Sequence, residues 1–315
     1  MIFFTPGPSQ LYPGVATFIQ QAIDLDVLSM SHRSDDFAAL HRQTCDQLRL
    51  LLRIPEDFRI FFISSATEGF ERVLQSCVKE KSFHFVNGAF SKRFYETGIQ
   101  LGLQSNAQIR EVGQGFDFDD PEIEASEMIC LVHNESSTGV RTALSNLYTV
   151  KKRNTLLLTV VDIVSSLPTE PVDFKYVDGV IFSVQKGFGI PSGLGVVIAS
   201  PMMMDRAHVL AKDNAVPTTF HNLAMMDPYF HKQMTPETPN VLNIYLLGRV
   251  AKAMNDYGRL RIFDDTVCKA DLIYSCLDRS NLLLPVVLDP TLRSNTMIVL
   301  AVEEEVQSVV LQALR

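Results

Sequence analysis

The feature that most constrains the fold is a regular alternation of apolar strands and amphipathic helices between residues 59 and 200. Each strand is a short run of β-branched or aromatic residues, and after the first strand apolar residues recur at helical spacing from Phe70 to Val78. The predicted strands are residues 59–64, 83–86, 128–132, 156–162, 180–184 and 196–199. This alternation predicts an α/β fold on a doubly wound, mostly parallel sheet.

The segment before this core begins irregularly. Residues 5–13 hold three prolines, which predicts an irregular arm over residues 1–14. A short helix is expected at 15–23, and a polar loop then leads to a longer helix with Ser34 as its cap.

Beyond Pro201 the pattern changes, because prolines break the chain repeatedly before a long helix at 241–257. A second helix ending at Leu277 follows, then short strands near 285–288 and 296–302 and a last helix from Glu303. The chain is therefore expected to form a large domain over residues 15–235 and a small α+β domain over residues 236–315.

Composition restricts the partners of the protein. Its 315 residues carry a net charge of −8 and no run of lysines and arginines, so we expect no nucleic-acid partner and no attraction to anionic membranes. No apolar stretch approaches the roughly 20 residues that a membrane span needs. The start of the sequence lacks a basic segment and soon meets Pro6 and Pro8, unlike a secretory signal, so a cytoplasmic location is expected.

The cysteines do not suggest a metal centre. They are odd in number, form no C-x-x-C pair and lie mostly in apolar periodic segments, which predicts buried free thiols. They are Cys45, Cys77, Cys130, Cys268 and Cys276.

Lys186 stands where a predicted strand meets a glycine-rich turn that leads into a second apolar run. This order displays an amine at the edge of a sheet, where backbone can approach a ligand closely. Asp162 ends another predicted strand, and the carboxyl ends of parallel strands meet at one edge, so the pair predicts a site there. Spacing alone leaves open that the lysine is solvated and that the aspartate is a turn or cap residue.

Ser65, Ala66 and Thr67 occupy a predicted turn between a strand and a helix. The free N–H groups and the dipole of a helix start favour an anion such as a phosphate. The alternative is that these residues only cap the helix.

One hypothesis unites Lys186, Asp162, this turn and Phe90: a bound pyridoxal phosphate. The cofactor requires an amine for a Schiff base, a carboxylate at its ring nitrogen, donors for its phosphate and an aromatic face. A protonated ring nitrogen makes the ring an electron sink, and the displaced lysine can then move a proton.

The wording of five motifs supports this hypothesis. They are SHRSDDF, HNESSTGV, VDIVSSLP, FSVQKGFGIPSGLG and TPETPNVLNIYLLG. In this order and spacing the chain resembles class V aminotransferases of the fold-type I pyridoxal-phosphate superfamily over almost its whole length. HNESSTGV and DPTLRSNT resemble the serine–pyruvate and alanine–glyoxylate branch, whereas SHR followed by an acid and a phenylalanine resembles phosphoserine aminotransferases.

The resemblance implies a role for each matching position. Lys186 corresponds to the Schiff-base lysine, Asp162 to the ring-nitrogen partner, Phe90 to the stacking aromatic and Ser136 to the residue near the ring hydroxyl. The phosphate would be held by Ser65, Ala66, Thr67 and Gln185, and by Thr235, with Thr238 as a further candidate, from the neighbouring subunit, so a homodimer is expected. His32 and Arg33 correspond to a substrate-side pair, with a surface pair at a helix start as the alternative. The substrates implied are a small amino acid, such as phosphoserine, serine or alanine, and a 2-oxo acid.

The chain departs from the family in one place. Relatives carry a glycine-rich segment that ends in an arginine for the substrate α-carboxylate, after the last strand of the small domain. Here TMIVLAV runs directly into EEEVQSVVLQALR, and neither Arg293 nor Arg315 matches. A non-catalytic member of the family is therefore a competing hypothesis.

The residues around Lys186 allow two more functions to be weighed. A pyridoxal-phosphate lyase or desulfurase of the same class would place histidine before the lysine, where this chain has Gln185. Glycines 187, 189 and 193 could instead form a dinucleotide-binding turn, although such a turn should open a helix and Pro191 disfavours one.

Overall fold

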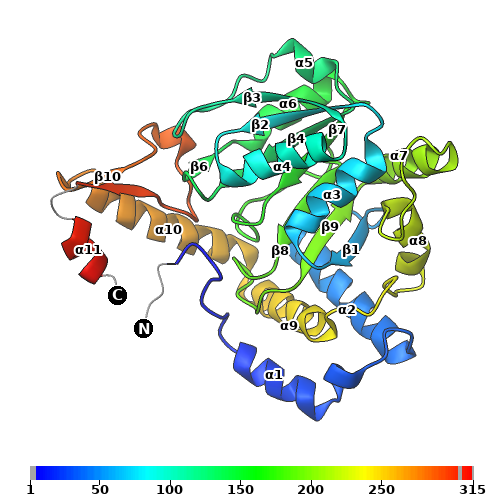
Figure 1. The fold of residues 1–315 in the computed structure, drawn as a ribbon. Helices are drawn as coiled ribbons and strands as arrows, with labels where there is room; N and C mark the ends of the chain where they lie inside the picture. Colours follow the sequence, from blue (N-terminus) through cyan, green and yellow to red (C-terminus); the bar gives the residue numbers. More distant parts are fainter. Residues whose placement is uncertain (1–4, 304–306, 314–315) are drawn as a thin grey trace.

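A computed structural model describes residues 5–303 and 307–313. Its centre is a sheet of seven strands in the order β1-β9-β8-β7-β4-β2-β3 (Figure 1). The strands are β1 (Arg59–Ile63), β2 (Lys81–Val86), β3 (Gln104–Ile109), β4 (Met128–Val132), β7 (Leu158–Asp162), β8 (Gly179–Ser183) and β9 (Gly195–Ala199). Neighbours from β8 to β3 pair in parallel, and β9 runs antiparallel to both β8 and β1. The predicted mostly parallel α/β sheet is confirmed.

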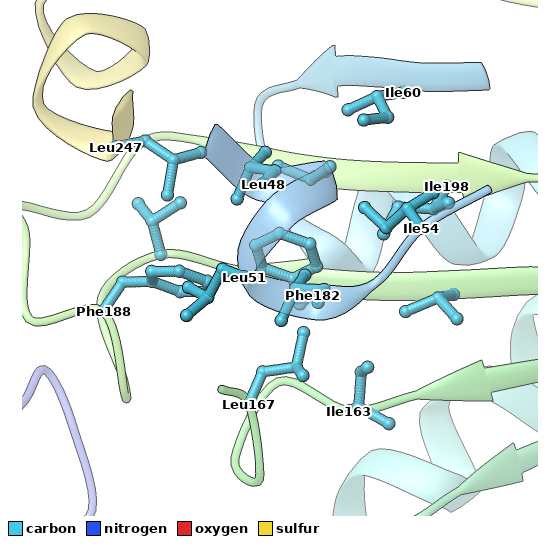
Figure 2. Close-up of a cluster of buried hydrophobic side chains, with 14 of the residues drawn as sticks. Leu48, Leu51, Ile54, Ile60, Ile163, Leu167, Phe182, Phe188, Ile198 and Leu247 are labelled. Atoms are coloured by element: carbon cyan, nitrogen blue, oxygen red, sulfur yellow. The ribbon is translucent and has the colours of Figure 1, made fainter. Parts of the chain in front are cut away.

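Helices cover both faces of the sheet, which explains why its middle strands are apolar throughout. One face packs against α3 (Ala66–Cys77), α4 (Ala89–Gln100) and α7 (Pro201–Lys212). The other packs against α2 (Asp35–Leu52), α6 (Leu144–Arg153) and α9 (Val241–Tyr257). On this second face Leu48, Leu51 and Leu247 meet Phe182 of β8, as Figure 2 shows. The shared core fixes the strand ends that carry the polar site.

Local signals set several helix boundaries as predicted. The Ser34 hydroxyl accepts a hydrogen bond from the N–H of Phe37 at 3.2 Å and so caps α2. The helix expected at 15–23 is α1 (Val15–Asp24), and the long helix expected at 241–257 is α9. The remaining short elements are η1 (Val27–Ser29), α5 (Pro121–Glu124), β5 (Asn134–Glu135), β6 (Val140–Arg141), α8 (Leu223–His231) and η2 (Pro290–Leu292).

The C-terminal region follows the prediction in kind but not in bounds. Helix α10 (Arg259–Leu277) precedes β10 (Leu283–Pro285), which pairs antiparallel with β11 (Leu300–Val302), and α11 covers Gln307–Ala313. The strand predicted over 296–302 is shorter because the Ser294 hydroxyl accepts from the N–H groups of Thr296 and Met297 and holds them in a turn. The predicted helix start at Glu303 runs into residues 304–306, outside the described residues. The division at residue 235 stays a prediction.

The expectation that the thiols are buried is wrong for two of the five. Cys45, Cys77 and Cys130 are buried, whereas Cys268 and Cys276 are exposed. Both lie on α10, which buries only Ala270, Tyr274 and Leu277 of its residues. Within residues 5–303 and 307–313, no three metal-binding side chains cluster, and no helix is long and apolar enough to cross a membrane.

Candidate active site

Lys186 lies in the turn after β8, at the carboxyl end of the sheet, and the N-terminal arm packs against it. Ser9 donates its N–H to the carbonyl of Gln185 at 2.8 Å and its hydroxyl to the carbonyl of Lys186 at 2.6 Å. The Lys186 ammonium donates to the Pro6 carbonyl, and a Cβ on Gly7 would lie 2.8 Å from that nitrogen. The arm therefore forms one wall around the lysine.

Burial lowers the pKa of the half-buried Lys186 ammonium, and the negative charge of Asp162 opposes this effect. A lysine with a lowered pKa is more often neutral and therefore a better nucleophile. The direction of this shift favours a covalent role for the amine.

Asp162 is the last residue of β7 and is only 4% exposed. Its Oδ1 accepts from the N–H of Val164 at 2.8 Å. The pKa of its carboxyl group is raised to about 7, mainly by burial and also by the charge of Glu135, while the hydrogen bond from Val164 and the charge of Lys186 oppose the rise. In the described part of the chain, Asp162 and Lys186 form no ion pair with each other.

The turn of residues 65–67 begins α3 beside this edge. The Ser65 hydroxyl accepts from the N–H of Glu68 at 3.2 Å, so the capping interpretation is correct for this residue. The N–H of Ala66 donates to the Ser183 hydroxyl at 2.8 Å, and Thr67 is exposed. A Cβ on Gly195 would come within 2.4 Å of the Ser65 carbonyl carbon, so only glycine lets β9 pass this close to the helix start. A phosphate role for the turn stays a prediction.

Phe90 lies in the first turn of α4, and its N–H donates to the Glu135 carboxylate at 3.1 Å. Its ring is half-buried, with the Arg93 guanidinium 5.5 Å from the ring centroid. Ser136, also half-buried, directly follows Glu135. The Glu135 carboxylate thus ties the start of α4, which carries Phe90, to the loop that carries Ser136, although 46 positions separate Phe90 and Ser136 in the sequence.

Arg33 and Thr235 form a second group. The Arg33 guanidinium donates to the carbonyls of Thr235 at 3.3 Å and Pro236 at 2.9 Å. Thr235 is buried and donates its hydroxyl to the Glu237 carbonyl at 2.7 Å. His32 is partly exposed, and its pKa is lowered by burial and by the Arg33 charge. Among the described residues, no hydrogen bond or ion pair joins this group to Lys186, so its assignment to a neighbouring site stays a prediction.

Sequence reasoning missed two contributors. The arm that holds Pro6, Gly7 and Ser9 was predicted only as an irregular segment, although its prolines restrict the path of the backbone. Glu135 stands between two predicted polar residues, but nothing local indicates that it is completely buried.

As predicted, Arg293 does not match an arginine for the substrate carboxylate, because its guanidinium is bound within the chain. Its guanidinium pairs with Asp278 at 2.9 and 3.1 Å and donates to the Val287 carbonyl at 3.1 Å. Arg315 lies outside the described residues.

A shallow pocket lies between loops of the sheet and α10. Its lining includes Asn134, Arg141, Glu170 and Phe263 but neither Lys186 nor Asp162. Because Lys186 and Asp162 do not line this pocket, we identify the candidate site by the chemistry of its residues and not by the presence of a pocket.

The residues at the sheet edge fit pyridoxal phosphate. The cofactor needs an amine, an acid for its ring nitrogen and donors for its phosphate. Lys186 offers an amine, Asp162 offers a buried carboxyl group that forms no ion pair in the described part of the chain, and α3 directs its start to the same edge. The dinucleotide interpretation is wrong, because glycines 187–193 lead into β9 and not into a helix.

Comparison with known proteins identifies the same chemistry. The family model for class-V aminotransferases matches residues 119–315. Phosphoserine aminotransferase from Corynebacterium glutamicum (strain R) is 27% identical over 297 residues, covering 92% of this chain and 77% of the relative. The corresponding enzyme of Rhodococcus opacus (strain B4) is 24% identical over 293 residues, with 92% and 77% covered.

Solved structures of aminotransferases are also similar to this chain. A phosphoserine aminotransferase from Cytophaga hutchinsonii is 38% identical, with a TM-score of 0.94 over 99% of this chain and 88% of that chain. An aspartate aminotransferase from Thermus thermophilus, 23% identical with a TM-score of 0.82 over 99% and 87%, shares the fold.

These matches confirm the predicted family, the fold and the cofactor, pyridoxal phosphate. They also confirm the predicted activity, transamination between a small amino acid and a 2-oxo acid. The chain belongs to the class-V aminotransferase family.

Proposed function

We propose that this protein is a phosphoserine aminotransferase, which exchanges an amino group between phosphoserine and a 2-oxo acid. The observation that carries the proposal is the likeness to the Cytophaga hutchinsonii enzyme, 38% identical over 99% of this chain. The His32-Arg33 pair supports it, since a guanidinium and an imidazole suit a phosphate group. Serine and alanine are the competing amino donors.

When bound, pyridoxal phosphate supplies an electron sink for charge that develops at the substrate α-carbon. Lys186 attaches the cofactor and, once displaced, moves a proton at that carbon. Its lowered pKa favours both tasks, because each begins from the neutral amine.

Asp162 would hold a proton at the ring nitrogen of the bound cofactor. Its carboxylate is buried and has no cationic side-chain partner within ion-pairing distance in the described chain, so a protonated ring nitrogen is the charge that would stabilise it best. Phe90 would supply the apolar face for the ring, and Ser136 a hydroxyl beside it.

The start of α3 is proposed to hold the cofactor phosphate through Ser65, Ala66 and Thr67, with Gln185. A helix N-terminus favours an anion through its N–H groups and its dipole. Ser65 already ties its hydroxyl to the helix, so Thr67, which is exposed, is the member best able to reach a ligand.

A cytoplasmic homodimer is the proposed working unit. Arg33 holds the carbonyls of Thr235 and Pro236, so the proposed substrate-side arginine and phosphate-side threonine are one connected group. Such a group supports a site shared between two copies, to which each chain contributes residues from outside its own lysine turn.

The desulfurase hypothesis is disfavoured by the thiols as well as by Gln185. Burial raises the pKa of Cys45 to about 12 and also raises that of Cys77 and Cys130, so these thiols stay protonated and unreactive. The two exposed cysteines lie on α10, and among the described residues neither forms a hydrogen bond to the lysine turn.

The test is a panel of amino donors given to purified protein loaded with pyridoxal phosphate. Phosphoserine should change the visible cofactor spectrum and yield the corresponding 2-oxo acid faster than serine or alanine. Preference for serine or alanine would refute the substrate assignment. A spectrum unmoved by every donor would favour a non-catalytic family member, and formation of alanine from cysteine, with sulfide released when a thiol reductant is present, would favour a desulfurase.

A further inference from the structure

Glu135 is a completely buried carboxylate surrounded by hydrogen-bond donors. Its Oε2 accepts from the N–H of Phe90 at 3.1 Å and from the N–H and hydroxyl of Ser91 at 2.8 and 2.9 Å. Its Oε1 accepts from the N–H and hydroxyl of Ser137 at 3.2 and 2.7 Å. Over residues 5–303 and 307–313, no lysine, arginine or histidine forms an ion pair with it. Hydrogen bonds, and not an ion pair, therefore hold this carboxylate in place.

The donors form the first turn of α4. The N–H of Ala89 donates to the Ser137 hydroxyl at 2.9 Å, so Glu135 and Ser137 together bind the N–H groups of three consecutive residues, 89–91. A carboxylate is stabilised at a helix N-terminus by the dipole and the free N–H groups. Phe90 is the middle residue of the three, so this contact fixes the backbone from which its ring projects.

Gly88 lets the carboxylate approach this closely. A Cβ at position 88 would lie 2.3 Å from the Glu135 Cγ and 2.5 Å from its Cδ. The backbone of Gly88 is extended, with φ of −176°, which any residue could adopt. Glycine is therefore required at position 88 because a side chain would have no room there, and not because of the backbone conformation.

Glu135 also acts on the ring-nitrogen side of the site. Its charge adds to burial in raising the pKa of Asp162. It directly precedes Ser136 in the chain. Glu135 thus binds the backbone N–H of Phe90, stands next to Ser136 in the chain and affects the pKa of Asp162, and these are the three residues assigned to the cofactor ring.

We propose that Glu135 is a positioning residue that fixes the Phe90 ring and the Ser136 hydroxyl around the pyridoxal-phosphate ring. The proposal rests on the proposed cofactor contacts of Phe90 and Ser136. Glu135 itself touches no reacting atom, since both its oxygens are occupied by donors of α4 and of Ser137.

The test begins with Glu135→Gln, because the amide nitrogen cannot accept the hydrogen bonds that one carboxylate oxygen accepts. The dissociation constant for pyridoxal phosphate should rise about tenfold, and the visible circular dichroism of the bound cofactor should change. Phe90→Ala should do the same. The double variant should bind no more than about twofold more weakly than the weaker single variant, because both changes remove one positioning effect.

Glu127→Gln is the matched control. The Glu127 carboxylate also binds the N–H groups of three consecutive residues, 79–81, at 3.0, 2.8 and 3.1 Å. These residues lie at the amino end of β2, away from the lysine turn. This control should lower thermal stability but leave the cofactor affinity and the circular dichroism as in the wild type.

Three results would overturn the proposal. They are a Glu135→Gln protein with wild-type affinity and circular dichroism, fully multiplicative effects of the Glu135 and Phe90 changes, and equal loss of affinity in the Glu127 control. If Glu135→Gln does not fold, Ser137→Ala decides, with an expected affinity loss of about two- to fivefold and an unchanged affinity as the contrary result. A wild-type protein that never acquires a visible cofactor signal would refute the cofactor assignment instead.

Discussion

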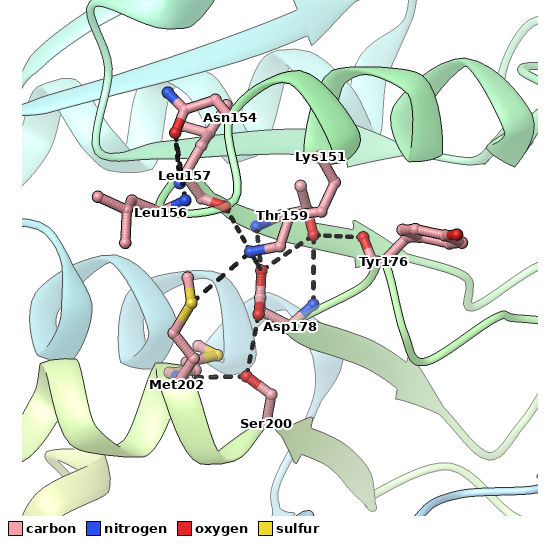
Figure 3. Close-up of polar contacts among 10 residues, drawn as sticks. Lys151, Asn154, Leu156, Leu157, Thr159, Tyr176, Asp178, Ser200 and Met202 are labelled. Atoms are coloured by element: carbon pink, nitrogen blue, oxygen red, sulfur yellow. Dashed lines mark hydrogen bonds and ion pairs between the residues drawn. The ribbon is translucent and has the colours of Figure 1, made fainter.

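The sheet carries a lysine and a buried aspartate at each of its two ends, and the two pairs are arranged differently. At the amino end of β7 and β8, Lys151 and Asp178 form an ion pair with Nζ and Oδ2 2.7 Å apart (Figure 3). Asp178 also accepts from the N–H and hydroxyl of Thr159 and from the Ser200 hydroxyl. Lys151 also donates to the Leu157 carbonyl. Both charges of this pair therefore have a partner.

At the carboxyl end, Lys186 and Asp162 are kept apart. The lysine donates to the Pro6 carbonyl, and the aspartate accepts from the N–H of Val164. Burial therefore lowers the pKa of the lysine and raises that of the aspartate to about 7. The same two residue types stabilise the fold where they are paired and are available for chemistry where they are not.

The largest effect on this comparison is expected from Lys186→Ala. Loss of the nucleophile should reduce transamination by at least about 10⁴-fold, while the unfolding free energy should change little, because the ammonium has no ion pair to lose. Steady-state kinetics and denaturant unfolding of the same preparation measure both quantities. A turnover within a factor of ten of that of the wild type would contradict the proposed difference between the lysines at the two ends of the sheet.

Asp178→Asn should have the opposite profile. Removing one partner of a buried ion pair leaves the Lys151 charge unpaired, at a cost of about 3–5 kcal/mol in unfolding free energy. Affinity for pyridoxal phosphate should stay as in the wild type. A double change to Lys151→Met and Asp178→Leu should recover much of the lost stability, because no charge remains buried. A stability equal to that of the wild type in the single variant would show that this pair is not structural.

Asp162 should make the stability of the cofactor-free protein depend on pH. Its pKa is about 7 in the folded chain against an ordinary value of 3.8, so the folded state binds a proton more tightly than the unfolded state. Stability from this group is present below about pH 4 and lost as the pH rises towards about 7, by an amount on the order of a few kcal/mol. Unfolding of wild type and Asp162→Asn across this range should diverge in slope, and parallel curves would contradict the raised pKa.

The smallest effect is expected from Ser9→Ala. The Ser9 hydroxyl donates to the Lys186 carbonyl at 2.6 Å, and its loss should loosen the lysine turn by about 1 kcal/mol. Activity should fall a few-fold with little change in cofactor affinity. Thr149→Ala is a matched control, since this hydroxyl binds a backbone carbonyl within α6. Equal losses of activity in both variants would deny the arm a role at the site.

Sequence alone predicted the sheet well where burial imposes a pattern. The runs ending at Asp162 and near Lys186 are buried on both faces, so their composition indicated strands directly. β3 was missed because its sequence, QSNAQI, is polar and it lies at the exposed edge of the sheet. α7 and α8 were also missed, since prolines suggested an irregular segment although Pro228 lies inside α8.

The residues of the candidate site also fall into two groups, those that local sequence patterns predicted and those that they did not. Lys186 and Asp162 end predicted strands, so local pattern was enough to bring them to one edge. Ser9 bonds to a residue 177 positions away, and Glu135 binds the start of a helix 45 positions earlier. Such contacts depend on tertiary packing, and no spacing in the sequence encodes them.

The central claim is that Lys186, and not its counterpart Lys151, is the amine that binds pyridoxal phosphate. Borohydride reduction of the loaded protein followed by peptide mass spectrometry measures this directly. The account predicts a phosphopyridoxyl mass on the peptide containing Lys186 and none on the peptide containing Lys151. Label on Lys151, label spread over surface lysines, or no label at all would contradict it.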